Sequence, residues 1–175
     1  MAASWSSSFT AELAAARIGA TYNQYARSEL LRERLSRYLA SYANAETILV
    51  GEAAGYRGAR VSGIPFTSER QLTGRGPGEA TATVVHRVLD ELGLGGDVLL
   101  WNVVPTHPGT PRTNRRPTSV EIDAARPLLD ELTLGRRVVA VGRVAAGVLD
   151  APYVRHPSHG GAARLAEQLQ RMLAA

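Results

Sequence analysis

The strongest constraint on the fold is a pattern that occurs four times: a short run of β-forming residues followed at once by glycine or polar residues. The first run, residues 48–50, is Ile-Leu-Val, and it leads into Gly-Glu-Ala-Ala-Gly at 51–55. Three such residues in a row suit a strand covered on both faces, and the glycines let a ligand approach the backbone. The other three runs are residues 98–101, 137–141 and 153–155.

Helical periodicity separates these runs. Apolar positions recur at helical spacing in residues 9–44, 79–92, 119–132 and 162–174. Strands that alternate with helices favour a parallel sheet with helices on both faces, and 175 residues fit one domain. We therefore predict a single α/β domain over residues 1–175, a three-layer αβα sandwich around a mainly parallel four-stranded sheet. Its core spans about 46–175.

Three local features carry further expectations. The N-terminal helical segment, about 9–44, contains no proline and is predicted to form one or two helices. Residues 51–78 are predicted to be a long loop, of the kind that usually binds a ligand. The helix at 119–132 starts at a capping box of Thr118 and Glu121. It contains Pro127, so we expect a kink or a short break there.

Composition excludes several classes of chemistry. The chain has no cysteine, which rules out thiolate catalysis, disulfides, cysteine-ligated zinc and cysteine-ligated iron–sulfur clusters. No apolar run approaches the length of a membrane span, and we expect a cytoplasmic monomer without a membrane contact. The net charge is +4, and every basic residue is arginine. Arginine favours bidentate contact with phosphates, although a solvated arginine-rich surface has the same composition.

The strand ends predict one shared pocket, because the carboxyl ends of parallel strands meet at one edge of a sheet. Glu52 and Asn102 follow the first two strands, and His156 follows the fourth. Phe66 adds a flat apolar face, and His107 lies in a loop that should border the same edge. An amide that both donates and accepts, an aromatic ring and a histidine are what a flipped-out nucleobase needs.

At this point the chain resembles the uracil-DNA glycosylase superfamily, over residues 48–164. Residues 51–55 resemble the family's Gly-Glu-Ala-Pro-Gly motif, and residues 156–158, His-Pro-Ser, resemble its later motif. Residues 63–66, Gly-Ile-Pro-Phe, are similar to the segment that carries the base-stacking aromatic. The resemblance implies an enzyme that hydrolyses the N-glycosidic bond of uracil in single- or double-stranded DNA, extending to other deaminated bases, and leaves an abasic site. It implies no metal and no cofactor.

Two departures from the family pattern bear on mechanism. The best-known branch has an aspartate third in the first motif, which orients the attacking water, and a tyrosine fifth, which excludes the thymine methyl group. This chain has Ala53 and Gly55 instead, so it resembles a different, cluster-free branch. Because Gly55 places no side chain at the tyrosine position, we expect this wall of the pocket to be less strictly closed than in that branch. With Ala53 in place of the aspartate, Glu52 is the residue expected to position the attacking water, and His107 is the alternative.

The resemblance and the loops together give a set of expected site residues. The expected catalytic residues are Glu52, His156, Asn102 and His107. The expected substrate-binding residues are Gly51, Ala53, Gly55, Phe66, Asn102 and Ser158. The expected DNA contacts are Arg115, Arg116, His159 and Arg164. Each has a plainer alternative: Asn102 as a loop cap, His156 as a turn residue and the arginines as a solvated loop. A non-catalytic nucleic-acid-binding relative is the alternative for the whole chain.

Overall fold

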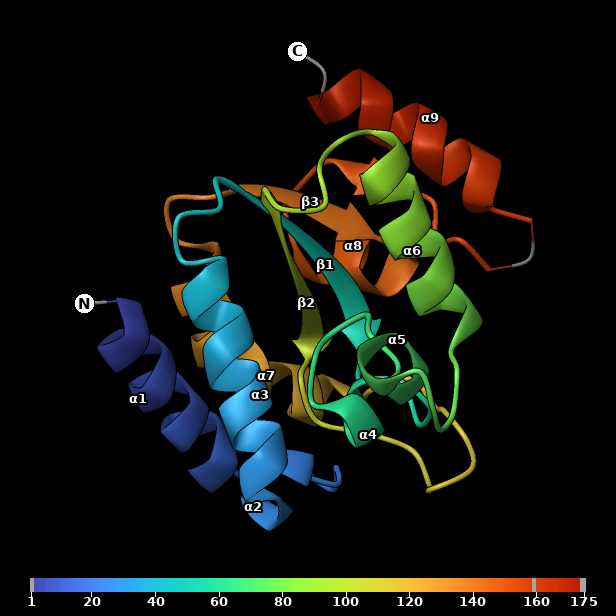
Figure 1. Ribbon diagram of the computed structural model, residues 1–175. Coiled ribbons are helices and arrows are strands. Elements are labelled where there is room, and N and C mark those ends of the chain that lie inside the picture. The colour runs from blue at the N-terminus through green and yellow to red at the C-terminus, as the bar shows by residue number, and fades with distance from the viewer. Residues whose placement is uncertain (1, 159, 174–175) are drawn as a thin grey trace.

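The computed structural model describes residues 2–158 and 160–173 as a four-stranded sheet between two layers of helices (Figure 1). The strand order is β2-β1-β3-β4, and each neighbouring pair is parallel. The strands are β1 (Thr47–Ala53), β2 (Val98–Val104), β3 (Arg137–Val141) and β4 (Tyr153–Val154). The predicted α/β fold is therefore confirmed, and the sheet is parallel throughout.

The described helices are more numerous than the sequence pattern suggested. They are α1 (Ala2–Ala15), α2 (Gln24–Arg27), α3 (Glu29–Ser41), α4 (Ala59–Ser62), α5 (Glu69–Thr73), α6 (Ala80–Glu91), α7 (Ser119–Thr133), α8 (Arg143–Val148) and α9 (Ala162–Leu173). The N-terminal segment forms three helices instead of one or two. Asn23 caps α2 by accepting hydrogen bonds from two backbone N–H groups, and Ser28 caps α3. The predicted loop at 51–78 contains two short helices.

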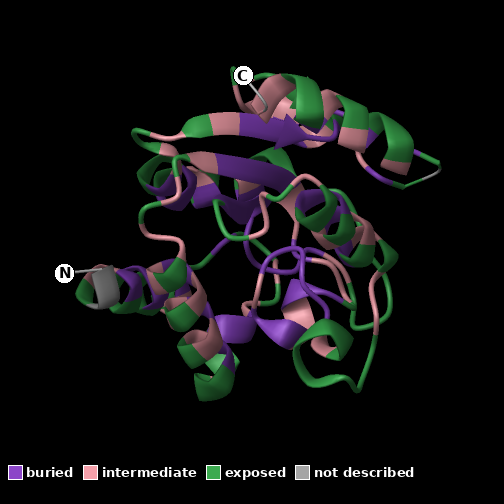
Figure 2. Ribbon diagram, turned by 45° about the horizontal axis from the view of Figure 1, so that its top comes forward, coloured by how far each residue is buried: buried purple, intermediate pink, exposed green. Residues whose placement is uncertain are grey.

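The sheet separates two apolar cores. Ile48 and Val50 of β1 pack with α1, α3 and α7 on one face, whereas Leu49 packs with α6 and α9 on the other. Figure 2 shows buried residues along the strands and exposed residues on the outer helix faces. Because all four strands run in the same direction, their carboxyl ends lie at one edge of the sheet, beside α4 and α5.

The outer edge of β2 is covered by a tyrosine. The hydroxyl of Tyr38 on α3 donates to the backbone oxygen of Leu100 at 3.1 Å and accepts from its N–H at 2.8 Å. Burial raises the pKa of the Tyr38 hydroxyl far above its ordinary value, so it remains a donor. Tyr38 thereby joins α3 to the edge strand β2 through both the N–H and the carbonyl oxygen of Leu100.

Helix α7 is continuous through Pro127. Of the predicted kink or short break, the break is therefore absent. Proline removes one hydrogen bond, that of the carbonyl four residues earlier. That carbonyl belongs to Asp123, an exposed residue where water can bind it.

No helix among residues 2–158 and 160–173 combines the length and the apolar character needed to cross a membrane.

Candidate active site

The first two strands bring Gly51 and Asn102 side by side. The two residues are partners in the parallel register of β1 and β2. Asn102 lies within β2, which continues to Val104 and so runs further than predicted. Its side chain is buried, and its amide has no hydrogen-bond partner among the described residues. A loop cap would need such a bond, so the amide is available to a ligand.

The ring of Phe66 lies over Gly51. A Cβ atom on Gly51 would come within 3.0 Å of two ring carbons, closer than real side chains approach. Phe66 itself has a φ of 51°, the left-handed region that bulky residues rarely occupy. Backbone strain of this kind persists where the surrounding structure imposes it, and it gathers at ligand sites. Glycine at 51 is therefore required by the position of the ring.

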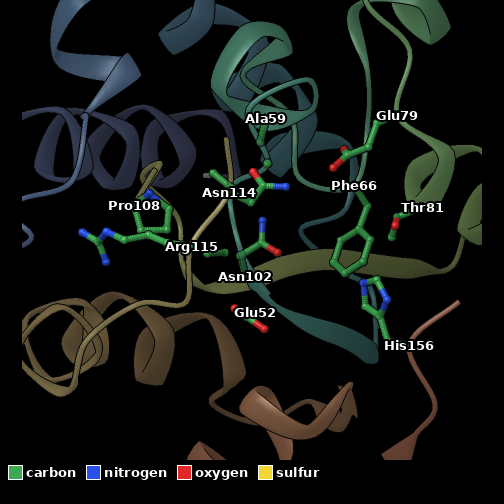
Figure 3. A pocket seen from close by; sticks show the side chains of 13 residues that line it. Glu52, Ala59, Phe66, Glu79, Thr81, Asn102, Pro108, Asn114, Arg115 and His156 are labelled. Carbon is green, nitrogen blue, oxygen red and sulfur yellow. The ribbon is translucent and has the colours of Figure 1, made fainter. Parts of the chain in front are cut away.

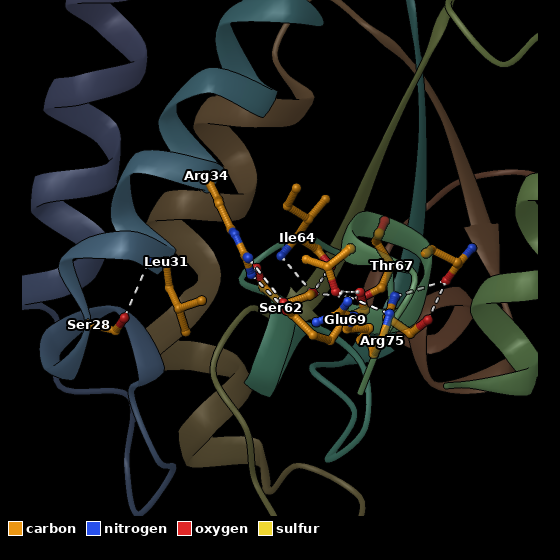
Figure 4. Close-up of polar contacts among 11 residues, drawn as sticks. Ser28, Leu31, Arg34, Ser62, Ile64, Thr67, Glu69 and Arg75 are labelled. Carbon is orange, nitrogen blue, oxygen red and sulfur yellow. Dashed lines mark hydrogen bonds and ion pairs between the residues drawn. The ribbon is translucent and has the colours of Figure 1, made fainter. Parts of the chain in front are cut away.

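Ser62 imposes the conformation of the loop that carries Phe66 (Figure 4). Its buried hydroxyl donates to the carbonyl oxygen of Thr67 at 2.6 Å and accepts from the N–H of Ile64 at 3.1 Å. Arg34 on α3 donates to the carbonyl of Ser62 at 3.2 Å and pairs with Glu69. The loop is thus fixed on both sides of the strained residue.

These groups enclose a cavity of about 250 Å³ at the strand ends (Figure 3). Pockets for drug-sized ligands measure roughly 300 to 1,000 Å³, so this one fits a single flat ring system. Its lining comes from loops and strand ends that are far apart in the chain. The lining residues are Glu52, Ala53, Ala54, Gly55, Ala59, Phe66, Glu79, Thr81, Asn102, Pro108, Asn114, Arg115 and His156.

His156 enters the cavity beside Phe66. Its Nδ1 accepts a hydrogen bond from the backbone N–H of Ser158 at 3.2 Å and lies 2.8 Å from the Ser158 hydroxyl. In a neutral imidazole with Nδ1 as acceptor, Nε2 carries the proton. Ser158 therefore sets the tautomer of the histidine. The predicted phosphate-binding hydroxyl is engaged with His156 in this structure.

Glu52 lies at the boundary between this cavity and a second hollow. Both are lined by Glu52 and His156. The second hollow also has three exposed arginines, Arg116, Arg143 and Arg155. Burial raises the pKa of the Glu52 carboxyl, and the charge of Arg116 acts against that rise. Arg143 and Arg155 were missed in the sequence, although both directly adjoin the strand-end residues Gly142 and His156.

The space over Gly55 is occupied. A Cβ atom on Gly55 or on Gly58 would come within 3.0 Å of a carboxyl oxygen of Glu79. The expectation that no side chain stands at this wall is therefore corrected, because Glu79 reaches it from the start of α6. Asn114 is a second residue that sequence reasoning missed; its oxygen accepts from the N–H of Tyr56 at 2.9 Å. No local pattern marked either one.

His107 lies outside the cavity wall. It is fully buried, and its ring nitrogens each lie 2.7 Å from a backbone oxygen, Nδ1 from that of Ala54 and Nε2 from that of Thr110. A neutral imidazole carries one N–H, so one of the two nitrogens donates to its carbonyl oxygen, and the ring lies between the two loops in either tautomer. His107 is therefore positioned to support the two loops and does not line the cavity.

The predicted DNA-contact residues fall into different places. Arg115 forms a bidentate ion pair with the buried carboxyl of Glu121. Arg116 lies in the second hollow, and Arg164 is exposed on α9 away from both hollows. His159 lies outside the described residues. Within residues 2–158 and 160–173, no three His, Cys, Asp or Glu side chains are grouped to hold a metal ion.

Comparisons with known proteins identify the family and the fold of the chain. Residues 39–173 match the model of the Uracil DNA glycosylase superfamily. Among solved structures, the fold is similar to the crystal structure of wild-type Pedobacter heparinus SMUG2, with a TM-score of 0.69. The match covers 99% of this chain and 95% of that chain at 14% identity. No curated protein matches the chain.

Proposed function

Because the chain belongs to the uracil-DNA glycosylase superfamily, we propose that it hydrolyses the N-glycosidic bond of uracil in DNA and leaves an abasic site. One observation carries this proposal. The buried amide of Asn102, which has no hydrogen-bond partner among the described residues, shares a base-sized cavity with the ring of Phe66 and with His156. Uracil offers N3–H as a donor and O4 as an acceptor, and one amide satisfies both together.

The leaving group is stabilised by two side chains in this mechanism. As the glycosidic bond breaks, the sugar develops positive charge and the base departs as an anion. His156 donates from Nε2 to the O2 carbonyl, and Asn102 donates to O4. A preorganised donor of this kind lowers a barrier by roughly 3 to 4 kcal/mol. Phe66 stacks on the face of the base and keeps water away from it.

Glu52 directs the water in this proposal. Its place at the boundary of the two hollows supports this role, because the glycosidic bond would lie where the base cavity meets the hollow proposed for the DNA backbone. As an ionised carboxylate it accepts the proton of a water whose oxygen bonds to C1′ of the sugar. The DNA backbone lies in the second hollow, where Arg116, Arg143 and Arg155 meet phosphates.

Release of free base from a uracil-containing oligonucleotide, measured in buffer with a chelator, tests the proposal. The wild type should release uracil and ignore cytosine, whose N3 and N4 reverse the donor pattern. Asn102→Ala should lower uracil release by about 100-fold or more at unchanged melting temperature. A folded wild type that binds uracil-containing DNA and releases no base would make the chain a non-catalytic binder.

A further inference from the structure

The side chain of Glu79 stands in the cavity without a protein partner. Glu79 occupies the N-cap position of α6, yet its carboxyl group makes no capping hydrogen bond. Its backbone carbonyl alone serves the helix, accepting from the N–H and the hydroxyl of Thr83, each at 3.1 Å. No described residue forms a hydrogen bond or an ion pair with the carboxyl group. Helix capping therefore does not explain where this side chain points.

The carboxyl group lies on the backbone of the loop that follows β1. It lies so close to Gly55 and Gly58 that a Cβ atom on either would collide with it. Two glycines thus leave a gap in the pocket wall, and one side chain from a distant helix fills it. Figure 3 shows Glu79 and His156 on opposite sides of Phe66, both directed into the pocket.

The position of Glu79 relative to the base follows by elimination, and this step rests on the function proposed above. With Asn102 on the N3–O4 edge and His156 toward O2, the remaining C5–C6 edge of the stacked ring faces the Glu79 side. A substituent at C5 would meet the carboxyl group and the glycine backbone behind it. Uracil has only a hydrogen at this position.

We propose that Glu79 is a specificity-determining residue, which closes the pocket wall over Gly55 and Gly58 and excludes pyrimidines that carry a C5 methyl group. The exclusion depends on the length of the side chain across the gap. A single methyl group that a pocket cannot take typically changes discrimination by roughly 10- to 200-fold. A variant with a shorter side chain at residue 79 should lose this discrimination against the methyl group, and a variant with a side chain of equal length should keep it.

Binding to uncleavable oligonucleotides tests the proposal without requiring turnover. The two probes are single-stranded oligonucleotides that carry 2′-fluoroarabino-uridine or its 5-methyl counterpart, and the readout is the ratio of their Kd values. The wild type, Glu79→Gln and Glu79→Met should favour the uridine probe by roughly tenfold or more. Glu79→Ala should bring the ratio to within about threefold of one, mainly by tighter binding of the 5-methyl probe. Glu91→Ala, at the exposed far end of α6, is the matched control and should behave as wild type.

The outcomes separate this proposal from the function on which it rests. A Kd ratio for Glu79→Ala equal to that of the wild type would overturn the role of Glu79, even if uracil is released. A collapsed ratio in a protein that releases no uracil would support Glu79 and refute the glycosylase. If Glu79→Ala does not fold, Glu79→Asp replaces it, and an unchanged ratio in that shorter variant overturns the proposal equally.

Discussion

Arg115 and Glu121 form a bidentate ion pair, with nitrogen–oxygen distances of 2.8 and 2.5 Å, on a carboxyl group that is 1% exposed. The N–H of Thr118 adds a third donor at 2.8 Å. Hydrogen bonds from Arg115 lower the pKa of Glu121 to about 2. Arg115, which was predicted to contact DNA and also lines the cavity, thus joins the pocket loop to the start of α7.

Glu121→Gln should therefore destabilise the protein by about 1 to 3 kcal/mol, because it removes the charge and one of the two acceptor oxygens and turns an NH2 group toward donors that the carboxylate had bound. The pKa of Glu121 is lowered on folding, so its contribution to stability is full above the ordinary value of 4.5 and is lost as pH falls through about 2. Urea unfolding at several pH values measures this. Arg115→Ala should cost less in the Glu121→Gln background than alone, and strict additivity would refute the coupling.

DNA binding should depend on the arginines of the second hollow. We expect the log of affinity for an uncleavable substrate to fall linearly with log salt, and Arg116→Ala with Arg143→Ala to flatten the slope by roughly 0.7 to 0.9 per lost phosphate contact. Base preference should not change. Arg87→Ala, paired on α6 with Glu91, is the control. An unchanged slope in the double variant would place the DNA elsewhere.

Variants of Glu52 and of His107 should have different effects. A change at Glu52 should lower the reaction rate, and a change at His107 should lower the melting temperature. Glu52→Gln should lower kcat by roughly 10²- to 10⁴-fold with little change in binding or in melting temperature. Because burial raises the pKa of Glu52, wild-type activity should decline with falling pH at a higher pH than an ordinary carboxyl would give. His107→Ala should instead lower the melting temperature. A stable His107→Ala with a crippled rate would reverse the assignment.

Ser62→Ala should destabilise the loop that carries Phe66. The variant loses the bonds to Thr67 and Ile64 that hold the loop around Phe66 in its strained conformation. We expect a loss of about 1 to 3 kcal/mol in unfolding free energy and weaker binding of the uridine analogue. Ser41→Ala, an exposed serine on α3, is the control. Full binding by a destabilised Ser62→Ala would show that Phe66 needs no such support.

Glu79→Gln should stabilise the protein at neutral pH. Burial raises the pKa of Glu79 above 4.5, so the folded state loses stability as pH rises through that value and into the raised range. A neutral amide avoids this loss. The gain in melting temperature over wild type should grow from pH 4 to pH 7. A gain of the same size at both pH values would mean that the carboxyl charge is not its cause.

Local sequence patterns were sufficient to predict which residues follow the strands and line the sheet edge. Ile48–Val50 and the residues after it predicted the sheet edge, and the pocket contains Glu52, Asn102 and His156 as expected. Tertiary contacts decided the rest. Nothing near Glu79 in the chain reveals that it reaches Gly55, and nothing near His107 reveals that its ring contacts the distant carbonyl oxygen of Ala54. Periodicity in the sequence indicates local secondary structure, so it does not reveal contacts between residues that are far apart in the chain.

The bond between Tyr38 and Leu100 has a consequence for how copies of this chain meet. An uncovered outer strand is a template on which a second chain can add its own strand, the first step toward aggregation. At Leu100 both backbone groups that such a strand would use are already bound by the tyrosine hydroxyl. The opposite edge, β4, is only two residues long. Tyr38→Phe should therefore leave the pocket intact and make the protein more prone to aggregate at high concentration.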